Sequence, residues 1–206
     1  MLTLAIDSAT EACSVALFEG DRLIAGDFRI LGRGHAELLV PMIAALPGKG
    51  KSDRIAVALG PGSFTGVRVG LAAARALAFA WRAELVGYPT LALIAAVARR
   101  QCGERPLTVA TTGGHGEWFL QSFTAEGTPL APLASLKPAE AAAATGEALV
   151  AGNQAEALVG LRGGGEAWVI LPDARALPLL PPAAFTSDVT PLYGRPPDAR
   201  LPPAAA

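Results

Sequence analysis

Cysteine and histidine are scarce in this chain, and the few that occur are isolated. Two cysteines and two histidines are too few for a disulfide framework or a zinc site. Cys13 and Cys102 each lie in an apolar segment, so we expect buried free thiols without a catalytic role. Neither His35 nor His115 has a second ligand at metal-binding spacing. The sequence therefore predicts no metal site.

The chain also has no long apolar run and no excess of one charge. Its longest apolar run, Leu91 to Ala98, is far shorter than the ~20 residues that cross a bilayer. No basic region precedes an apolar segment at the N-terminus, so we expect a cytoplasmic protein without membrane contact. A formal net charge of −1 and dispersed arginines argue against a whole-domain footprint for nucleic acid. Any contact with RNA is then local or shared with a partner.

The apolar pattern of the first half predicts three strands, then a helix, and then alternating strands and helices. A mostly apolar run that ends in a polar turn predicts the first strand, and turn residues at Gly20-Asp21 favour a hairpin between the next two. We expect strands at 2–9, 13–19, 22–30, 54–59 and 84–88, and helices at 35–46, 63–81 and 90–101.

The second half repeats this order in a weaker form, which predicts two similar α/β lobes, each a mixed sheet with helices. The second lobe is the smaller of the two. We expect strands at 107–111, 117–124, 129–133 and 148–151, and helices at 138–144 and 154–161. The predicted division is a first lobe at 1–102, a second lobe at 103–195 and a proline-rich disordered tail at 196–206.

The stretch LGPGSFTGVR at 59–68 joins a predicted strand to a predicted helix. Its glycines follow the spacing G-x-G-x-x-x-G, one residue longer than a dinucleotide fingerprint. The first acidic residue downstream, Glu84, precedes the next strand, whereas a ribose-binding carboxylate should follow it. Phosphate binding at the helix N-terminus and simple capping by Ser63 both remain open. The GKS at 50–52 is not a phosphate loop, because position 45 is alanine and the strand and helix are in reverse order.

A stripe of small residues follows one face of this predicted helix. Glycines inside a helix cost roughly 1 kcal/mol each relative to alanine, so a close contact with another backbone should offset that cost. The spacing fits a helix of the same chain, with residues 35–46 as a candidate, and equally a second chain. The stripe, spaced four residues apart, consists of Gly62, Gly66, Gly70, Ala74 and Ala78.

Three first-half motifs together resemble the TsaB (YeaZ) family: AIDSATEACSVAL at 5–17, HAELLVP at 35–41 and GPGSFTGVRVG at 60–70. Isolated matches follow at 116–119, 136–138 and in the P-x-Y-x-R pattern at 191–195. The resemblance implies the two-lobed fold of actin-like ATPases. It also implies a non-catalytic subunit that pairs with a TsaD-like catalytic subunit and a TsaE-like ATPase, which together place threonylcarbamoyl on the adenosine beside the anticodon of tRNA.

Further expectations about partners and surfaces come from the same resemblance. It implies tRNA contact only through the complex, no cofactor, and homodimer formation as an option for the isolated chain. The family pairs through two helices of its first lobe. The interface residues carried over in this way are His35, Leu38, Leu39, Met42, Pro61, Gly62, Phe64, Gly66, Arg68, Gly70 and Ala74.

Two turns that hold phosphate in active relatives are incomplete here. The first reads Asp7-Ser8-Ala9-Thr10 and has no glycine where backbone must approach a phosphate, so Asp7, Ser8 and Thr10 form a degenerate phosphate loop. The second, Thr111 to Gly114, has no acidic residue and departs from the family's Asp-Ala-Arg. The alternative is an ATP-dependent kinase or ATPase. A peptidase has the least support, because no Ser-His-Asp arrangement is visible.

Overall fold

The computed structural model describes residues 1–194, so the predicted tail at 196–206 lies outside the described residues. The first lobe is built on a five-stranded sheet in the order β3-β2-β1-β4-β5. The hairpin strands β2 and β3 pair antiparallel, whereas β4 and β5 run parallel to β1. The strands are β1 (Leu2–Asp7), β2 (Ala12–Glu19), β3 (Arg22–Ile30), β4 (Arg54–Ala58) and β5 (Glu84–Tyr88).

The second sheet repeats this topology in the order β8-β7-β6-β9-β10. Here β6 takes the place of β1: it pairs antiparallel with β7 and parallel with β9. The predicted two-lobed α/β fold with a reduced second lobe is confirmed. The strands are β6 (Leu107–Thr112), β7 (Trp118–Phe123), β8 (Ala134–Leu136), β9 (Leu149–Ala151) and β10 (Glu166–Trp168).

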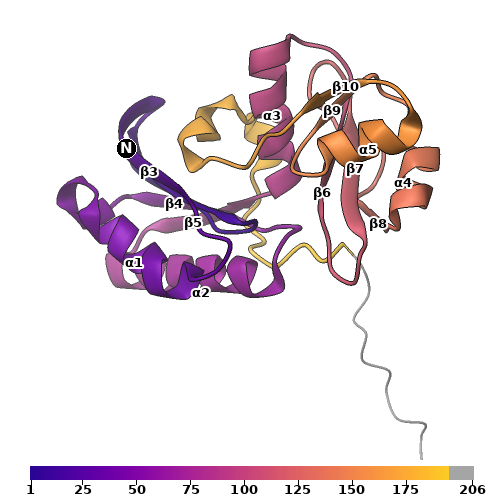
Figure 1. Cartoon of the computed structure of the whole chain (residues 1–206). Coiled ribbons are helices and arrows are strands. Elements are labelled where there is room, and N and C mark those ends of the chain that lie inside the picture. Colours follow the sequence, from indigo (N-terminus) through magenta and orange to yellow (C-terminus); the bar gives the residue numbers. More distant parts are fainter. Residues whose placement is uncertain (195–206) are drawn as a thin grey trace, which may run out of the picture.

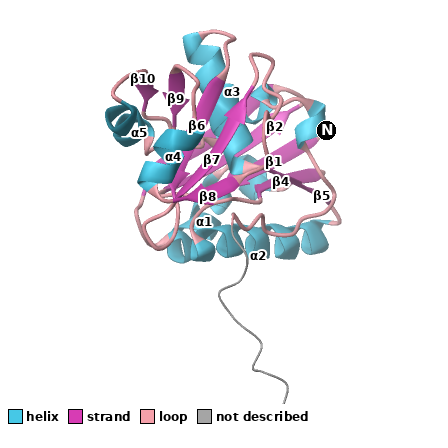
Figure 2. Ribbon diagram, turned by 90° about the vertical axis from the view of Figure 1, so that its right-hand side faces the viewer, coloured by secondary structure: helices cyan, strands magenta, loops and turns pink. Residues whose placement is uncertain are grey.

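Helices α1 (His35–Ala45) and α2 (Phe64–Trp81) lie side by side on one face of the first sheet (Figure 1). Figure 2 shows α2 along one side of the molecule, beyond the strands. Ser63 caps α2 by accepting a hydrogen bond from the Gly66 amide, as its position before the helix predicts. Helices α4 (Pro138–Ala144) and α5 (Ala155–Arg162) cover the second sheet. In the described part of the chain, no helix has the length and apolar character of a membrane span.

Two segments connect the lobes and complicate the predicted division at residue 102, which stays a prediction. Helix α3 (Thr90–Cys102) contributes Leu93 to the core of the first lobe and Leu91 and Ile94 to the core of the second. After β10 the chain returns to the first sheet. There the 3-10 helix η2 (Ala174–Leu179) covers the face opposite α1 and α2, and two further short 3-10 turns are η1 (Pro47–Gly50) and η3 (Pro182–Ala184).

Two strands of the structure differ from the prediction. The strand expected at 129–133 begins later, at Ala134, and residue 129 makes only an isolated bridge with Phe123. The three-residue strand β10 was not predicted, because it follows a glycine run and is too short to show a period. Cys13 is a buried free thiol, as expected. For Cys102 the expected burial is wrong: it is a free thiol that is partly exposed, because it is the last residue of α3.

Candidate functional site

The turn between β1 and β2 packs directly against the first turns of α2. The Ser8 hydroxyl donates a hydrogen bond to the Gly66 carbonyl at 2.9 Å, and the Ser63 amide donates to the Ala9 carbonyl at 2.7 Å. A Cβ on Gly66 would lie 2.1 Å from the Ser8 carbonyl oxygen, and one on Gly62 would lie 1.9 Å from that of Ala9. The glycines are therefore needed because main chain lies against main chain here.

This packing corrects the prediction for the small-residue stripe. The backbone that approaches it belongs to the chain's own β1–β2 turn, neither to a second chain nor to residues 35–46. Gly70 faces the Ser8 hydroxyl, and Ala74 is fully buried. The spacing of small residues correctly indicates a close approach, but it does not identify the segment that approaches.

Most of the predicted interface residues are buried within the chain, so the prediction that they form a surface is wrong for them. Leu39 and Met42 of α1 belong to the core of the first lobe. The His35 Nε2–H donates to the Thr10 carbonyl at 2.8 Å and thereby fixes the β1–β2 turn. The buried set is His35, Leu39, Met42, Pro61, Gly66, Gly70 and Ala74, and the accessible set is Leu38, Gly62, Phe64 and Arg68.

Asp7, the first member of the predicted degenerate phosphate loop, is fully buried. Its carboxylate accepts hydrogen bonds from the Ala9 amide at 3.1 Å and the Tyr88 hydroxyl at 3.3 Å. Burial raises its pKa to about 7, although the two donors stabilise the charged carboxylate and so lower the pKa in part. The other two predicted residues differ in position: Ser8 is bonded to α2, whereas Thr10 lines a cavity.

That cavity lies between the lobes and has a volume of about 780 Å³. The β1–β2 turn and the first turn of α2 form one side of it. The β6–β7 turn, with Thr112 to His115, and Phe119 of β7 form the other. Residues 191–194 complete the wall. The volume falls in the range of about 300–1,000 Å³ that is typical of small-molecule sites.

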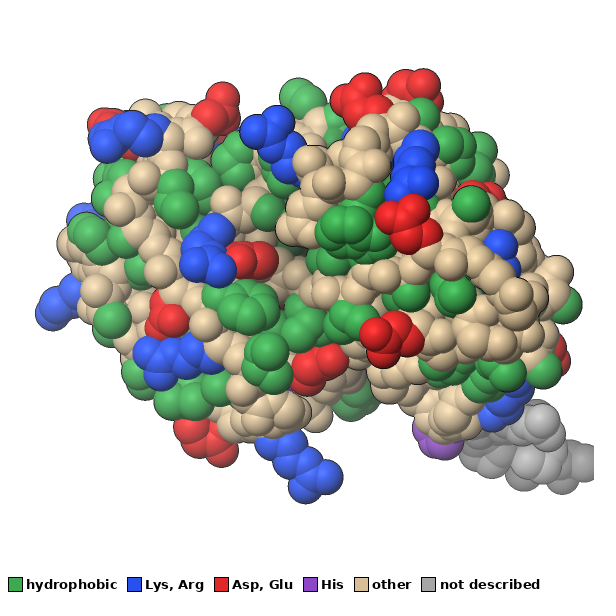
Figure 3. Space-filling model, turned by 45° about the horizontal axis from the view of Figure 1, so that its top comes forward, with side chains coloured by type: hydrophobic (Ala, Val, Ile, Leu, Met, Phe, Trp, Pro, Cys, Tyr) green, Lys and Arg blue, Asp and Glu red, His purple; other side chains and the backbone are tan. Residues whose placement is uncertain are grey.

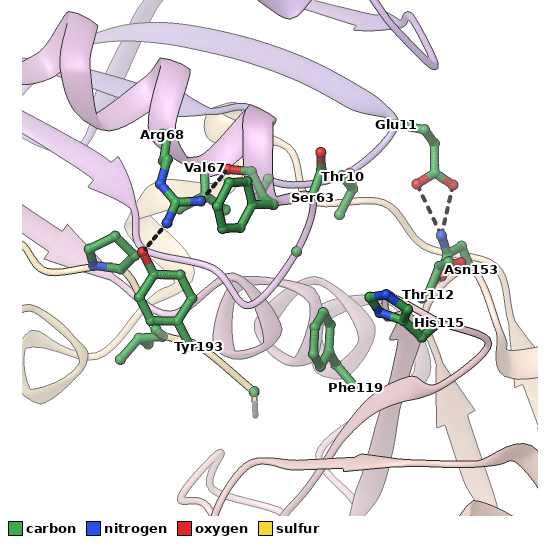
Figure 4. Close-up of a pocket in the computed structure, with 18 of the residues that line it drawn as sticks. Thr10, Glu11, Ser63, Val67, Arg68, Thr112, His115, Phe119, Asn153 and Tyr193 are labelled. Atoms are coloured by element: carbon green, nitrogen blue, oxygen red, sulfur yellow. Dashed lines mark hydrogen bonds between the residues drawn. The ribbon is translucent and has the colours of Figure 1, made fainter. Parts of the chain in front are cut away.

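At one end of the cavity, the Arg68 side chain lies among aromatic rings (Figure 4). Its guanidinium donates to the Tyr193 hydroxyl at 2.7 Å and to the Phe64 carbonyl at 3.4 Å. The guanidinium carbon lies 3.2 Å from the centre of the Phe64 ring and 5.4 Å from that of Tyr193. Among residues 1–194, Arg68 makes no ion pair with a carboxylate.

At the other end, a hydrogen-bonded pair joins the two lobes (Figure 4). The side-chain nitrogen Nδ2 of Asn153 donates to both carboxylate oxygens of Glu11, at 2.9 and 3.0 Å. The side-chain oxygen Oδ1 of Asn153 accepts a hydrogen bond from the Thr112 backbone amide at 2.9 Å. Asn153 therefore couples the second-lobe turn that departs from the family pattern to the first turn of the chain.

Sequence reasoning missed Asn153 and Phe119, and it gave no role to Glu11. The pairs that build the cavity are far apart in the chain, since Glu11 and Asn153 are separated by 142 residues and Arg68 and Tyr193 by 125. Local signals marked parts of the cavity wall, namely the motif at 60–70, the turn at 111–114 and the P-x-Y pattern at 191–193, but none of them indicated that these segments meet. Among the described residues, no group of three or more His, Cys, Asp or Glu side chains could bind a metal.

A second surface feature is the outward face of α1 and α2, opposite the small-residue stripe. We define this face by Val40, Pro41, Ala72, Ala76 and Phe79, all of which are exposed. The Phe79 side chain is 90% exposed and that of Val40 is 55% exposed. Exposed apolar residues that gather on one face often mark a surface where another protein binds.

Comparisons with known proteins agree with the motifs. Residues 29–158 match the family described as TsaD: tRNA N6-adenosine threonylcarbamoyltransferase. The chain is 37% identical over 128 residues to the tRNA threonylcarbamoyladenosine biosynthesis protein TsaB of Escherichia coli, which covers 60% of this chain. The match spans about half of that protein, 55% of its length.

Two solved structures from Pseudomonas aeruginosa share the fold over nearly their whole length. One, described as YeaZ, is 25% identical with a TM-score of 0.78 and covers 93% of this chain and 100% of its own. The other, described as an uncharacterized protein with similarity to peptidase YEAZ, is 27% identical with a TM-score of 0.77 and covers 94% and 99%.

Proposed function

The chain belongs to the TsaB (YeaZ) family, and from this membership we propose that it is a non-catalytic subunit in tRNA threonylcarbamoyladenosine formation. In this proposal it pairs with a TsaD-like catalytic subunit and works with a TsaE-like ATPase. The relationship to the family described as TsaD supports pairing, because homologous chains of one fold often associate through equivalent surfaces.

The observation that carries the proposal is the exposed apolar face of α1 and α2. Since the small-residue stripe seats α2 on its own sheet, the opposite side of the helix is left to solvent. That side presents the Phe79 ring, 90% exposed, beside the small side chains of Ala72 and Ala76. An exposed aromatic side chain beside small side chains is suited to enter a partner's pocket and to exclude water there.

The geometry of the first turn supports the non-catalytic part of the proposal. Asp7 is buried beneath the turn and hydrogen-bonded to Ala9 and Tyr88, so its carboxylate is not presented to the cavity. Ser8, the next polar residue, is bonded to α2. In the second lobe the equivalent turn presents Thr112, Gly113 and Gly114 to the cavity, without a carboxylate to orient magnesium.

In the same proposal, tRNA contacts this chain only as part of the complex. Basic and acidic side chains are intermixed over the face drawn in Figure 3, and the formal net charge is −1. Such a surface has little long-range attraction for a polyanion, whose binding depends largely on clustered cations.

Co-purification tests the proposed interface. The chain and the TsaD-like subunit of the same organism are mixed and analysed by size-exclusion chromatography. The wild type is compared with the variant Phe79→Glu. A charge at the centre of an apolar contact should weaken the complex by at least tenfold. The matched control is Leu161→Glu, because Leu161 is an exposed apolar helical residue of the second lobe, 56% exposed.

Two results would contradict the proposal. A complex that persists in Phe79→Glu would refute this location of the interface. Hydrolysis of ATP with turnover by the isolated chain, measured in the presence of magnesium, would refute the non-catalytic role and favour the ATPase alternative. Analytical ultracentrifugation of the isolated chain shows whether the same face forms a homodimer, which Phe79→Glu should then dissociate.

A further inference from the structure

We propose that the cavity between the lobes binds a small aromatic carboxylate, with its ring against Phe64, Phe119 and Tyr193 and its carboxylate on Arg68. This inference concerns a ligand of the chain itself and does not depend on the proposed role in the complex. Four observations support it: the size of the cavity, its aromatic wall, the fixed orientation of Arg68 without a carboxylate partner among residues 1–194, and the balance of charge across the cavity.

The size and the wall fit one flat organic molecule. A volume of about 780 Å³ is ample for a ring of one or two cycles with a short acidic side chain. Phe64 and Tyr193 remain 68% and 54% exposed, although each is a large side chain at the edge of a concave surface. A ring placed between them and Phe119 would remove this apolar surface from water.

Arg68 is prepared to bind an oxyanion. Its guanidinium is held in place by the Tyr193 hydroxyl and the Phe64 carbonyl, and it has more N–H donors than these bonds use. It is stacked on the Phe64 ring, so its orientation is fixed before any ligand arrives. No carboxylate of residues 1–194 pairs with it. The planar guanidinium can bind a carboxylate through two parallel hydrogen bonds, as it can a phosphate, and the charges on the cavity wall distinguish the two.

The charges on the wall favour a single negative charge over a polyphosphate. Glu11 lies at the far end of the cavity, where Asn153 holds its carboxylate by two hydrogen bonds. One guanidinium against one carboxylate leaves little net attraction for a chain of phosphates. The first turn of α2 lies beside Arg68, and its positive dipole end adds to the attraction for an anion there.

Calorimetric titration of the full chain with indole-3-acetate tests the proposal. We expect saturable binding, together with shifts of the Gly113 and Gly114 amide signals in NMR spectra, because these residues line the cavity. Tryptophol has the same ring without the charge, and it should bind about tenfold more weakly. AMP should also bind more weakly than indole-3-acetate because of its extra charge.

Paired variants locate the site. Arg68→Gln should weaken binding of indole-3-acetate about tenfold, whereas Arg75→Gln should not, although Arg75 lies on the same helix and also bonds to the C-terminal segment. Phe64→Ala should weaken binding, and Phe79→Ala should leave it unchanged. Thermal denaturation first confirms that each variant is folded; should Arg68→Gln unfold, the Phe64 and Phe79 pair decides.

Four results would overturn the proposal: no saturable binding of indole-3-acetate, equal affinity for tryptophol, tighter binding of AMP, or unchanged binding in both Arg68→Gln and Phe64→Ala. The outcome is separate from that of the complex. Loss of the TsaD-like partner in Phe79→Glu with intact ligand binding would support both proposals, and the failure of one leaves the other standing.

Discussion

Gly66→Ala should destabilise the chain, although alanine is the better helix former. The new methyl carbon would lie 2.1 Å from the Ser8 carbonyl oxygen, far inside van der Waals contact. Ser8 cannot move away freely, because its hydroxyl is bonded to the Gly66 carbonyl and the next carbonyl, that of Ala9, is bonded to the Ser63 amide. The clash is therefore with main chain that is fixed on both sides.

The magnitude follows from two opposing effects. Overpacking costs about 1–3 kcal/mol and sometimes more, and contact with fixed main chain places Gly66 at the upper end. Replacing a helical glycine by alanine returns about 1 kcal/mol. We expect the free energy of unfolding to fall by about 2 kcal/mol or more, which lowers Tm by about 4–8 °C for a chain of this size.

The same substitution at Gly160 is the matched control. Gly160 lies in α5, and a Cβ there would meet no atom within 4 Å. Gly160→Ala should therefore raise the free energy of unfolding by at most about 1 kcal/mol. The gain should be below this maximum, because Gly160 lies near the end of the helix. Urea and thermal denaturation followed by circular dichroism measure both variants. A Gly66→Ala chain as stable as the wild type would refute the close packing of α2 on the β1–β2 turn.

Three further substitutions test the turn and the lobe contact. Asp7→Asn should remove a pH dependence of the free energy of unfolding. Burial raises the Asp7 pKa from 3.8 to about 7, so the folded state binds the proton more tightly than the unfolded state does. The stability of the wild type should therefore fall as pH rises between these two values, whereas that of the variant should not. Denaturation from pH 4.5 to 8 measures this, and parallel curves would contradict it. His35→Ala should lower stability by about 1–3 kcal/mol, because the buried Thr10 carbonyl loses its donor; an unchanged urea midpoint would count against this role. Asn153→Ala should speed hydrogen exchange at the Thr112 amide and lower Tm by a few degrees, through loss of the bonds to Glu11; unchanged exchange would show that the lobes do not depend on this link.

The elements of the first lobe were predictable because each has a clear local pattern. The strands β3 at Arg22–Ile30 and β5 at Glu84–Tyr88 have the predicted bounds, since turn residues and a β-rich run mark them. In the second lobe, α4 at Pro138–Ala144 also has the predicted bounds, because a proline in the first helical turn marks its start. The strand at 129–133 was misplaced because apolar residues between prolines resemble a strand without forming one. A local pattern therefore indicates whether a segment is a helix or a strand better than it indicates which other segments that element contacts.

The candidate site was harder to predict, because it depends on contacts between distant segments. Periodicity identified the face of α2 that is in close contact but not the backbone of Ser8 and Ala9 that fills it. No local signal joins Glu11 to Asn153 across the lobes, since one follows a strand and the other precedes a helix of the second half. The cavity needs both lobes in place before its residues meet.

The packing of α2 explains why a partner surface and a ligand cavity can coexist on one helix. The glycine face lies on the β1–β2 turn, and this seat fixes the rotation of the helix about its axis. With that rotation fixed, Arg68 and Phe79 lie on nearly the same side of the helix, about three turns apart. Arg68, near the start of the helix, lines the cavity beside the second lobe, whereas Phe79, near its end, faces solvent. A bulky residue in the stripe would disturb both surfaces together, whereas changes at Phe79 or Arg68 act on one surface each. Loss of partner binding in a stripe variant would therefore reflect a displaced helix, and only substitutions on the outward face can locate the interface.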